Sequence, residues 1–270
     1  MQQLNLLSNK TKTEIAIDFI REHEPPEGYF VGFSGGKDSI VTLDLVQRAG
    51  VKHQAYYSAT GIDPPEVVKF INENYPYVIH KRPNEMGCRS FYGMIVNNGF
   101  PSIFARWCCN SLKKDPTKNI PLLNRIMGLR AEESSNRAKR GKISKLKKWT
   151  IYKPIFNWME WEIWDYIEEN NIQYPSLYDE GFDRIGCVIC PFICGKNKKH
   201  IDRNRARWPK HYVAFEKAMR RLWDTRDSVR MIEKGYATSF DEYLENWYTG
   251  NILRKNKMKD DSNMWEDDAE

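Results

Sequence analysis

The residues at positions 34–39 read Ser-Gly-Gly-Lys-Asp-Ser, and no other feature constrains the fold of this chain as strongly. They follow an apolar, strand-like run at 28–33 and precede a segment with helical periodicity that starts near residue 40. A glycine pair at a strand-to-helix turn lets the backbone approach a ligand closely. The amides of the first helical turn favour an anion, to which a lysine adds charge. The pattern therefore predicts a pyrophosphate-binding loop made of Ser34, Gly35, Gly36, Lys37, Asp38 and Ser39.

An isolated Gly-Gly pair is more often a simple turn, but this six-residue string after an apolar strand favours nucleotide binding. The loop is not a Walker A motif, because Asp38 follows Gly36-Lys37 and Val31 stands at the earlier glycine position. It resembles the PP-loop of the adenine-nucleotide α-hydrolase group, which includes ATP pyrophosphatases and the phosphoadenosine phosphosulfate (PAPS) reductase family. The resemblance implies an adenine nucleotide as ligand, with ATP and Mg²⁺ as the substrate. We expect Lys37 to face solvent at this loop.

Strand-like and helical segments alternate over most of the chain. The strand-like segments are 28–33, 51–58, 77–80, 122–129 and 150–155. The helical segments are 11–22, 40–49, 65–74, a stretch around residue 94, 160–170, 209–221 and 240–247. This order predicts an α/β fold: a Rossmann-like, doubly wound parallel sheet with helices on both faces and a mainly helical, cysteine-bearing C-terminal region. We expect a nucleotide-binding domain over 1–175 and a second region over 176–270 that ends in an acidic tail.

Two further loops at strand ends match motifs of the PAPS reductase family, and the match spans about residues 28–195. The first contains Thr60-Gly61, which the resemblance places beside the adenosine. The second begins at Gly128 and contains Arg130 and Arg137, which the resemblance places beside the phosphates. An arginine suits this position because its planar fork binds phosphate oxygens in pairs. Lys37, Asp38 and Arg130 are the candidate catalytic residues, whereas the acids at 132–133 are equally well explained as the start of a helix.

The cysteines form a second pattern, with Cys108-Cys109 followed by Cys187-x-x-Cys190. This arrangement resembles the sulfonucleotide reductases that hold a 4Fe-4S cluster, and the DNA-phosphorothioation sulfurtransferases of the same superfamily. Four thiolates suit such a cluster, although they also suit structural zinc or can be buried thiols. Cys194 lies in the same loop and is an alternative ligand. Cys88 lies outside the pattern, as a small buried hydrophobic residue.

Nothing after Cys194 is a cysteine, whereas sulfonucleotide reductases attack sulfur with a cysteine in a C-terminal tail. In related enzymes the reaction is instead attack on the α-phosphate of ATP, which gives an adenylated acceptor and pyrophosphate and is followed by sulfur transfer. The resemblance therefore implies an ATP pyrophosphatase or sulfurtransferase that uses a sulfur-donor protein. The alternatives are a PAPS or APS reductase with an external thiol, and a non-catalytic nucleotide sensor or nucleic-acid-binding module.

Charge is distributed unevenly along the chain. The net charge is +6, but residues 260–270 carry six acids and no base, so the rest of the chain carries +12 (6 + 6). Two basic stretches, 137–148 and 196–210, flank the loop motifs. Such stretches are usually solvated surface, and the first equally suits a lid over the triphosphate, but together they raise the possibility of a nucleic-acid acceptor.

Composition excludes whole-chain disorder, because 41% of the residues are hydrophobic. The sequence has no apolar run long enough to cross a bilayer and no signal-peptide pattern at its first residues. We therefore expect a cytoplasmic protein without a membrane partner. In that compartment its six cysteines are expected to be metal ligands or free thiols.

Overall fold

The first elements of the chain form a helix, a strand and a second helix. The computed structural model describes residues 10–83, 90–194 and 198–252. Helix α1 (Lys12–Glu22) begins after Thr11, whose hydroxyl accepts a hydrogen bond from the Glu14 amide. The Glu14 carboxylate accepts one from the Thr11 amide in return, which completes a capping box. Strand β1 (Tyr29–Phe33) and helix α2 (Lys37–Ala49) follow.

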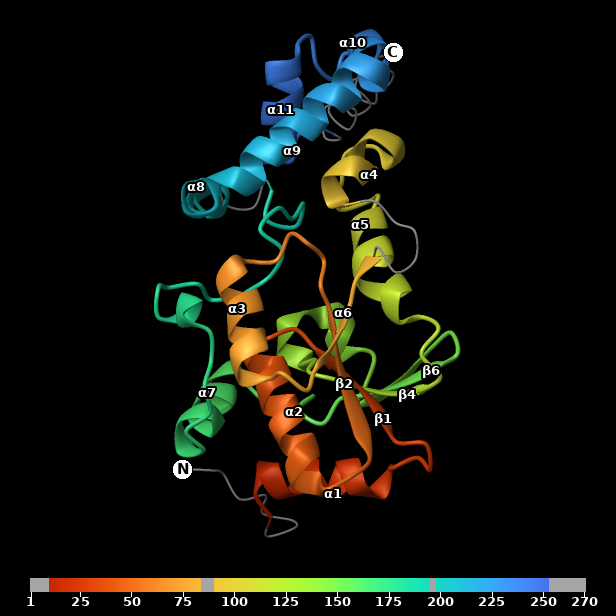
Figure 1. Cartoon of the computed structure of the whole chain (residues 1–270), viewed down its shortest axis with the longest axis vertical. Coiled ribbons are helices and arrows are strands. Elements are labelled where there is room, and N and C mark those ends of the chain that lie inside the picture. The colour runs from red at the N-terminus through yellow and green to blue at the C-terminus, as the bar shows by residue number, and fades with distance from the viewer. Residues whose placement is uncertain (1–9, 84–89, 195–197, 253–270) are drawn as a thin grey trace, which may run out of the picture. The chain divides into compact units, whose positions relative to one another are not determined.

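Strand β1 lies inside a six-stranded sheet with the order β3-β2-β1-β4-β6-β5 (Figure 1). The other strands are β2 (His53–Ser58), β3 (Ile79–Lys81), β4 (Asn124–Met127), β5 (Ile143–Leu146) and β6 (Trp149–Tyr152). All pairings are parallel except that of β5 with β6. Because β2 and β4 lie on opposite sides of β1, the strand order reverses there. Ligands in such sheets bind beyond the carboxyl ends of the strands at this switch point.

The edge strand β5 is absent from the elements expected from the sequence. It forms an antiparallel hairpin with β6, and the turn between them includes Lys147 at a φ of 55°. Its residues lie inside the basic stretch 137–148, where lysines hide the alternation that usually marks a strand. Lysine on an exposed edge strand also discourages pairing with other chains, which gives this charge a structural reason.

Helices and short turns surround the sheet. They are α3 (Pro65–Asn74), α6 (Ser135–Ala138), α7 (Glu160–Glu169) and the 3-10 turns η3 (Asp115–Thr117), η4 (Ala131–Glu133) and η5 (Ser176–Tyr178). Helix α2 contacts α1, α7, β1 and β4. Ile20, Val31, Leu43 and Ile126 are fully buried in this layer. Burial of each such side chain is worth about 1.5–3 kcal/mol, so α2 and the loop before it are held firmly on the sheet.

The chain divides into two compact units that alternate along the sequence. Within the described residues, the first unit comprises 10–59, 63–82 and 114–185. The second comprises 60–62, 83, 90–113, 186–194 and 198–252. The first holds the whole sheet and the second is helical, in agreement with the predicted α/β class and helical C-terminal region. The predicted domain boundary after residue 175 stays a prediction.

The second unit packs around aromatic side chains. Its helices are α4 (Phe91–Asn98), α5 (Trp107–Cys109), α8 (Lys198–Arg207), α9 (Pro209–Leu222), α10 (Ser228–Glu233) and α11 (Phe240–Thr249), with π-helical turns η2 (Asn110–Lys114) and η6 (Trp223–Asp227). Phe215 of α9 is fully buried, and its ring lies 4.4 Å from that of Trp247 and 6.4 Å from that of Phe91. Among the described residues, no helix is both long and apolar enough to span a bilayer.

Candidate functional site

The loop between β1 and α2 makes a tight turn that depends on Gly35. This residue has a φ of +71°, and a Cβ placed on it would lie 2.9 Å from two side-chain carbons of Ile71 and 3.0 Å from one of Val67. Gly36 is the N-cap of α2 and has extended backbone angles, with no side chain to cap the helix. Because the N-cap residue is a glycine, it places no side chain over the first amides of α2, which suits an anion-binding helix N-terminus.

The two serines of the loop hydrogen-bond to each other. The Ser39 hydroxyl donates to the Gly36 carbonyl at 2.8 Å. It also accepts from the Ser34 amide and the Ser34 hydroxyl, both at 3.2 Å. These bonds hold the turn in shape, and the predicted contact of Ser34 and Ser39 with phosphate stays a prediction.

Lys37 is buried, so the expectation that it faces solvent was wrong. Only 4% of the residue is exposed. Its Nζ lies 2.9 Å from Oε1 of Glu160 and donates to the carbonyl oxygen of Asp183 at 2.8 Å. The same nitrogen lies 5.1 Å from the ring centre of Tyr178 and 5.8 Å from that of Trp164. Burying an ammonium group is costly unless it is paired, and these acceptors provide the pairing.

Arg130 lies beside the loop, as predicted, and it is also buried. Its Nε lies 2.5 Å from Oδ1 of Asp38, and its NH1 pairs with Glu132. Burial lowers the pKa of Arg130, but the nearby carboxylates of Asp38, Glu132 and Glu133 outweigh burial and raise it above its ordinary value. The structure thus brings together the three candidate catalytic residues, Lys37, Asp38 and Arg130, at the start of α2.

Gly128 explains how Arg130 reaches Asp38. A Cβ on Gly128 would lie 2.6 Å from the Asp38 carbonyl oxygen and 2.9 Å from the Thr42 hydroxyl. Only a glycine allows the chain after β4 to lie this close to the first turn of α2. Gly128 therefore has a packing role in the structure, and its direct contact with nucleotide stays a prediction.

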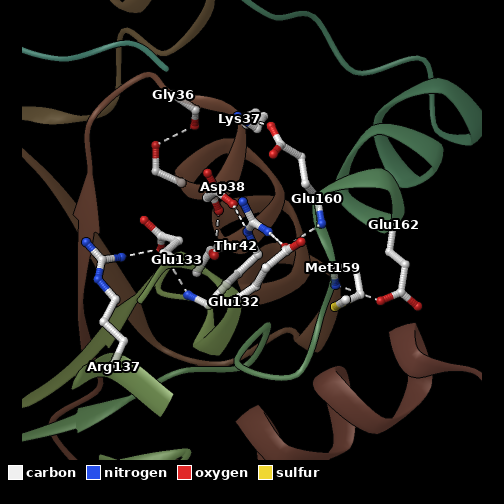
Figure 2. Close-up of polar contacts among 12 residues, drawn as sticks. Gly36, Lys37, Asp38, Thr42, Glu132, Glu133, Arg137, Met159, Glu160 and Glu162 are labelled. Carbon is white, nitrogen blue, oxygen red and sulfur yellow. Dashed lines mark hydrogen bonds and ion pairs between the residues drawn. The ribbon is translucent and has the colours of Figure 1, made fainter. Parts of the chain in front are cut away.

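Glu132 connects the site to helix α7, and Figure 2 shows its contact with Glu160. Glu132 accepts a hydrogen bond from the Glu160 amide at 2.8 Å while it also pairs with Arg130. Glu133 pairs with Arg137 and accepts from the Arg130 amide at 3.1 Å. Arg137 is thus already held by an acid, and its predicted phosphate contact stays a prediction. The acids at 132–133 lie in the 3-10 turn η4.

Three residues at this site were missed from the sequence: Glu160, Tyr178 and Asp183. The Tyr178 hydroxyl accepts a hydrogen bond from the Lys37 amide at 3.0 Å. None of the three lies in a glycine-rich or otherwise recognisable pattern, and no signal in the sequence linked them to Lys37. The predicted adenosine-side residues Thr60 and Gly61 belong to the second unit, where Thr60 accepts from the Ile62 amide at 3.2 Å. Their contact with nucleotide stays a prediction.

The described cysteines all lie in the second unit and are free thiols. A hydrogen bond with Cys109, burial, and the neighbouring Cys187 and Cys190 raise the pKa of Cys108. The hydrogen bond from Cys108, with help from nearby bases, lowers the pKa of Cys109 to about 5. The four predicted ligands therefore lie within electrostatic range of one another. Cys194 donates to the Cys190 carbonyl at 3.7 Å, and Cys88 lies outside the described residues.

The chemistry of these four thiols fits a 4Fe-4S cluster or zinc, because thiolates are the preferred ligands of both. In residues 10–83, 90–194 and 198–252, no group of three or more His, Cys, Asp or Glu side chains is close enough to hold a metal ion. The assignment of Cys108, Cys109, Cys187 and Cys190 as metal ligands stays a prediction.

The two basic stretches have different structures. The first, 137–148, runs through α6 and the β5 hairpin, and its Lys145, Lys147 and Lys148 are exposed. The second, 196–210, includes α8, where Arg205 pairs with Glu216 at 2.7 Å. Residues 196–197 lie outside the described part.

Comparison with known proteins identifies the family. Residues 28–192 match the phosphoadenosine phosphosulfate reductase domain. An uncharacterized protein of Methanocaldococcus jannaschii is 30% identical over 220 residues, which cover 76% of this chain and 44% of that protein. A phosphoadenosine 5'-phosphosulfate reductase of Gloeobacter violaceus is 26% identical over 163 residues, which cover 56% of this chain and 66% of that protein.

A solved structure supports the fold. The crystal structure of phosphoadenylyl-sulfate reductase from Candida auris in a phosphate complex has a TM-score of 0.51 and 18% identity, and covers 67% of this chain and 90% of that one. This chain spans less than half the length of two Methanocaldococcus jannaschii relatives, 44% of one and 40% of the other. These matches confirm the resemblance inferred from the motifs. The chain belongs to the phosphoadenosine phosphosulfate reductase family.

Proposed function

We propose that this chain binds ATP at the loop before α2 and cleaves it at the α-phosphate in support of sulfur transfer. The observation that supports this best is the pair of buried cations, Lys37 and Arg130, at the N-terminus of α2, where the glycine N-cap makes no side-chain hydrogen bond. A helix N-terminus with two adjacent cations is suited to a polyphosphate. We propose an adenine nucleotide as the ligand because the chain matches the phosphoadenosine phosphosulfate reductase domain.

Cleavage at the α-phosphate is proposed from the phosphates that the two cations would hold. If the loop amides, Lys37 and Arg130 hold the β- and γ-phosphates, the group stabilised as leaving group is pyrophosphate. An acceptor oxygen then attacks the α-phosphorus, the bond to pyrophosphate breaks, and the acceptor carries AMP. A sulfur nucleophile from a donor protein can next displace AMP from the acceptor. Mg²⁺ enters with the nucleotide, and the hard carboxylate oxygens of Asp38 and Glu132 suit it.

The product test separates this proposal from a Walker-type reaction. Full-length protein with MgATP and a candidate acceptor should release pyrophosphate and AMP, or an AMP adduct. Release of ADP and orthophosphate would contradict cleavage at the α-phosphate. Tight ATP binding without turnover for any acceptor would favour the nucleotide sensor.

The reductase relatives make sulfonucleotide reduction the second candidate. Residues 195–270 contain no cysteine, so a reductase reaction would need a thiol from outside this segment. Incubation with PAPS or APS and a dithiol protein tests this candidate directly. Sulfite release under those conditions, without pyrophosphate release from ATP, would replace our proposal with the reductase.

The four cysteines would serve as ligands of a 4Fe-4S cluster, which would supply structural and electronic support to sulfur chemistry. We expect anaerobically purified protein to be brown and to contain equal amounts of iron and sulfide. Cys109→Ser should lose the metal, whereas the matched Cys194→Ser should keep it. One zinc per chain without iron would reject the cluster, and the reverse result for the two variants would make Cys194 the ligand.

A polynucleotide is the acceptor that the basic hairpin supports. The exposed lysines at 145, 147 and 148 have no ion pair with a described acid. Binding through such groups releases counterions and weakens steeply with salt. Polynucleotides of different sequence and strandedness are therefore the first acceptors for the product test, at low and moderate ionic strength.

A further inference from the structure

Three oxygen atoms from one later segment of the chain surround Lys37. We call this segment, residues 160–183, the strap. It comprises α7, η5 and the residues that connect and follow them. The Tyr178 hydroxyl accepts from the Lys37 amide, and the Glu160 carboxylate and Asp183 carbonyl accept from its Nζ, all within 3.0 Å. These are the bonds that phosphate oxygens would make at an anion-binding loop.

The bond to Tyr178 uses the amide that a phosphate would need. A backbone amide has a single hydrogen, so a phosphate oxygen must compete with the Tyr178 hydroxyl for it. Tyr178 is held in place by Trp164 and Tyr174, whose ring centres lie 5.0 and 6.3 Å from its own. Burial raises the pKa of its hydroxyl to about 12, so the group is neutral at physiological pH.

The Lys37 ammonium group also has most of its hydrogen-bonding capacity occupied by acceptors within the protein. Two of its three hydrogens point to strap oxygens, and its side chain is 5% exposed, which leaves little room for a ligand. Glu160 reaches it from the solvent side, because 48% of the Glu160 side chain is exposed. A partly exposed carboxylate can move away at a modest cost, since water can solvate it.

Glu160 also connects the two cations of the site, and Figure 2 labels Lys37, Glu160 and Glu132 of this set of contacts. Its side chain holds Lys37, and its amide holds Glu132, which pairs with Arg130. A change in the position of α7 would therefore release Lys37 and remove one hydrogen bond from Glu132, while Arg130 keeps its contact with Asp38. The strap and the loop belong to the same compact unit.

We propose that the strap is an internal competitor for the phosphate-binding loop: Tyr178 and Glu160 occupy the anion positions on Lys37, and a nucleotide polyphosphate must displace both. The inference rests on the proposed function of the loop. The inference also predicts which class of ligand can displace these two side chains from Lys37. A triphosphate has several charged oxygens, enough to replace both the Glu160 carboxylate and the Tyr178 hydroxyl on Lys37, whereas adenosine has no charged oxygen.

The test compares three single substitutions in the full-length protein, with α,β-methylene-ATP as the probe and its Kd measured by calorimetry. Glu160→Gln and Tyr178→Phe should each tighten binding about three- to tenfold, because each weakens the closed state. Glu168→Gln removes the same charge from an exposed position on α7 and should stay within about twofold. Tyr178→Phe leaves the net charge unchanged, so tighter binding by this variant could not be explained by a change in net charge.

The outcomes separate the strap from the loop's function. Equal affinity in the wild type and all variants would contradict the proposal that the strap competes with the nucleotide. It would leave the proposal that the loop binds ATP unaffected. Weaker binding by Tyr178→Phe would also contradict the proposed competition, because the hydroxyl would then be a ligand of the nucleotide. No binding by any variant would overturn both proposals.

A second measurement needs no variant. If the strap opens before ATP enters, the observed binding rate of the wild-type protein should reach a plateau as ATP concentration rises. A rate that rises linearly through the accessible range would contradict a strap that must open first.

Discussion

Replacement of Lys37 by methionine should lower the rate of pyrophosphate release by about 100- to 1,000-fold, the usual cost of removing one group that stabilises charge in the transition state. Methionine keeps much of the length of the lysine side chain and can still pack against Trp164 and Tyr178. The loss should appear in kcat/KM, measured with a coupled pyrophosphate assay under saturating acceptor. A kcat/KM within a few-fold of wild type would remove Lys37 from the proposed catalytic group.

The burial of Lys37 requires a control for lost stability. Lys153 provides one, because it is 3% exposed and its Nζ donates to the Gly141 carbonyl at 2.6 Å and the Ser144 hydroxyl at 2.8 Å. Lys153→Met therefore removes a similarly buried and hydrogen-bonded ammonium at a place remote from the loop in sequence. We expect both variants to lose comparable stability in thermal unfolding, and only Lys37→Met to lose turnover.

Gly35→Ala should destabilise the protein by about 2–4 kcal/mol. The new Cβ meets Ile71 and Val67 at 3.0 Å or less, and the φ of +71° is unfavourable for alanine. The measurement is the free energy of unfolding in urea. Gly50→Ala is the control for backbone strain alone, because Gly50 has a φ of +70° and nothing lies within 4 Å of its Cβ position.

Gly36→Ala should behave in the opposite way. A Cβ there would lie 3.4 Å from the Tyr178 hydroxyl and 3.6 Å from that of Ser34, so the fold has room for it. We expect near-normal stability with loss of ATP binding, because the methyl group would occupy space that the phosphates need. A destabilised Gly36→Ala, or a Gly35→Ala as stable as wild type, would show that the two glycines have been assigned the wrong roles.

The sequence predicted local features well because their causes are local. The loop between β1 and α2 depends on adjacent residues, and α3 has the bounds 65–74 expected from its starting prolines and its periodicity. The place of Arg130 beside the loop was also predictable, since parallel strands end at the same edge of the sheet. Strand β5 was missed because it is only four residues long and because the lysines at 145, 147 and 148 of its hairpin hide the alternation of a strand.

The partners of Lys37 were not predictable from the sequence in the same way. Tyr178 and Asp183 lie 141 and 146 residues further along the chain. No periodicity links positions so far apart, and the motif itself describes only what the loop offers to a ligand. The motif's lysine looks solvent-exposed when it is considered alone, and only the tertiary structure shows that it is enclosed by acceptors.

The alternation of the two units along the chain has a consequence for biosynthesis. Cys108 and Cys109 belong to the second unit, but residues 114–185 of the first unit are translated before Cys187. At about 5–20 residues per second, the first cysteine pair leaves the ribosome roughly 4–16 s before its partners. The sheet can be completed during that interval, when Cys108 and Cys109 are present but Cys187 and Cys190 have not yet been made. A metal delivered during that interval would meet an incomplete set of thiols, so loading is expected only after Cys187 and Cys190 have been made.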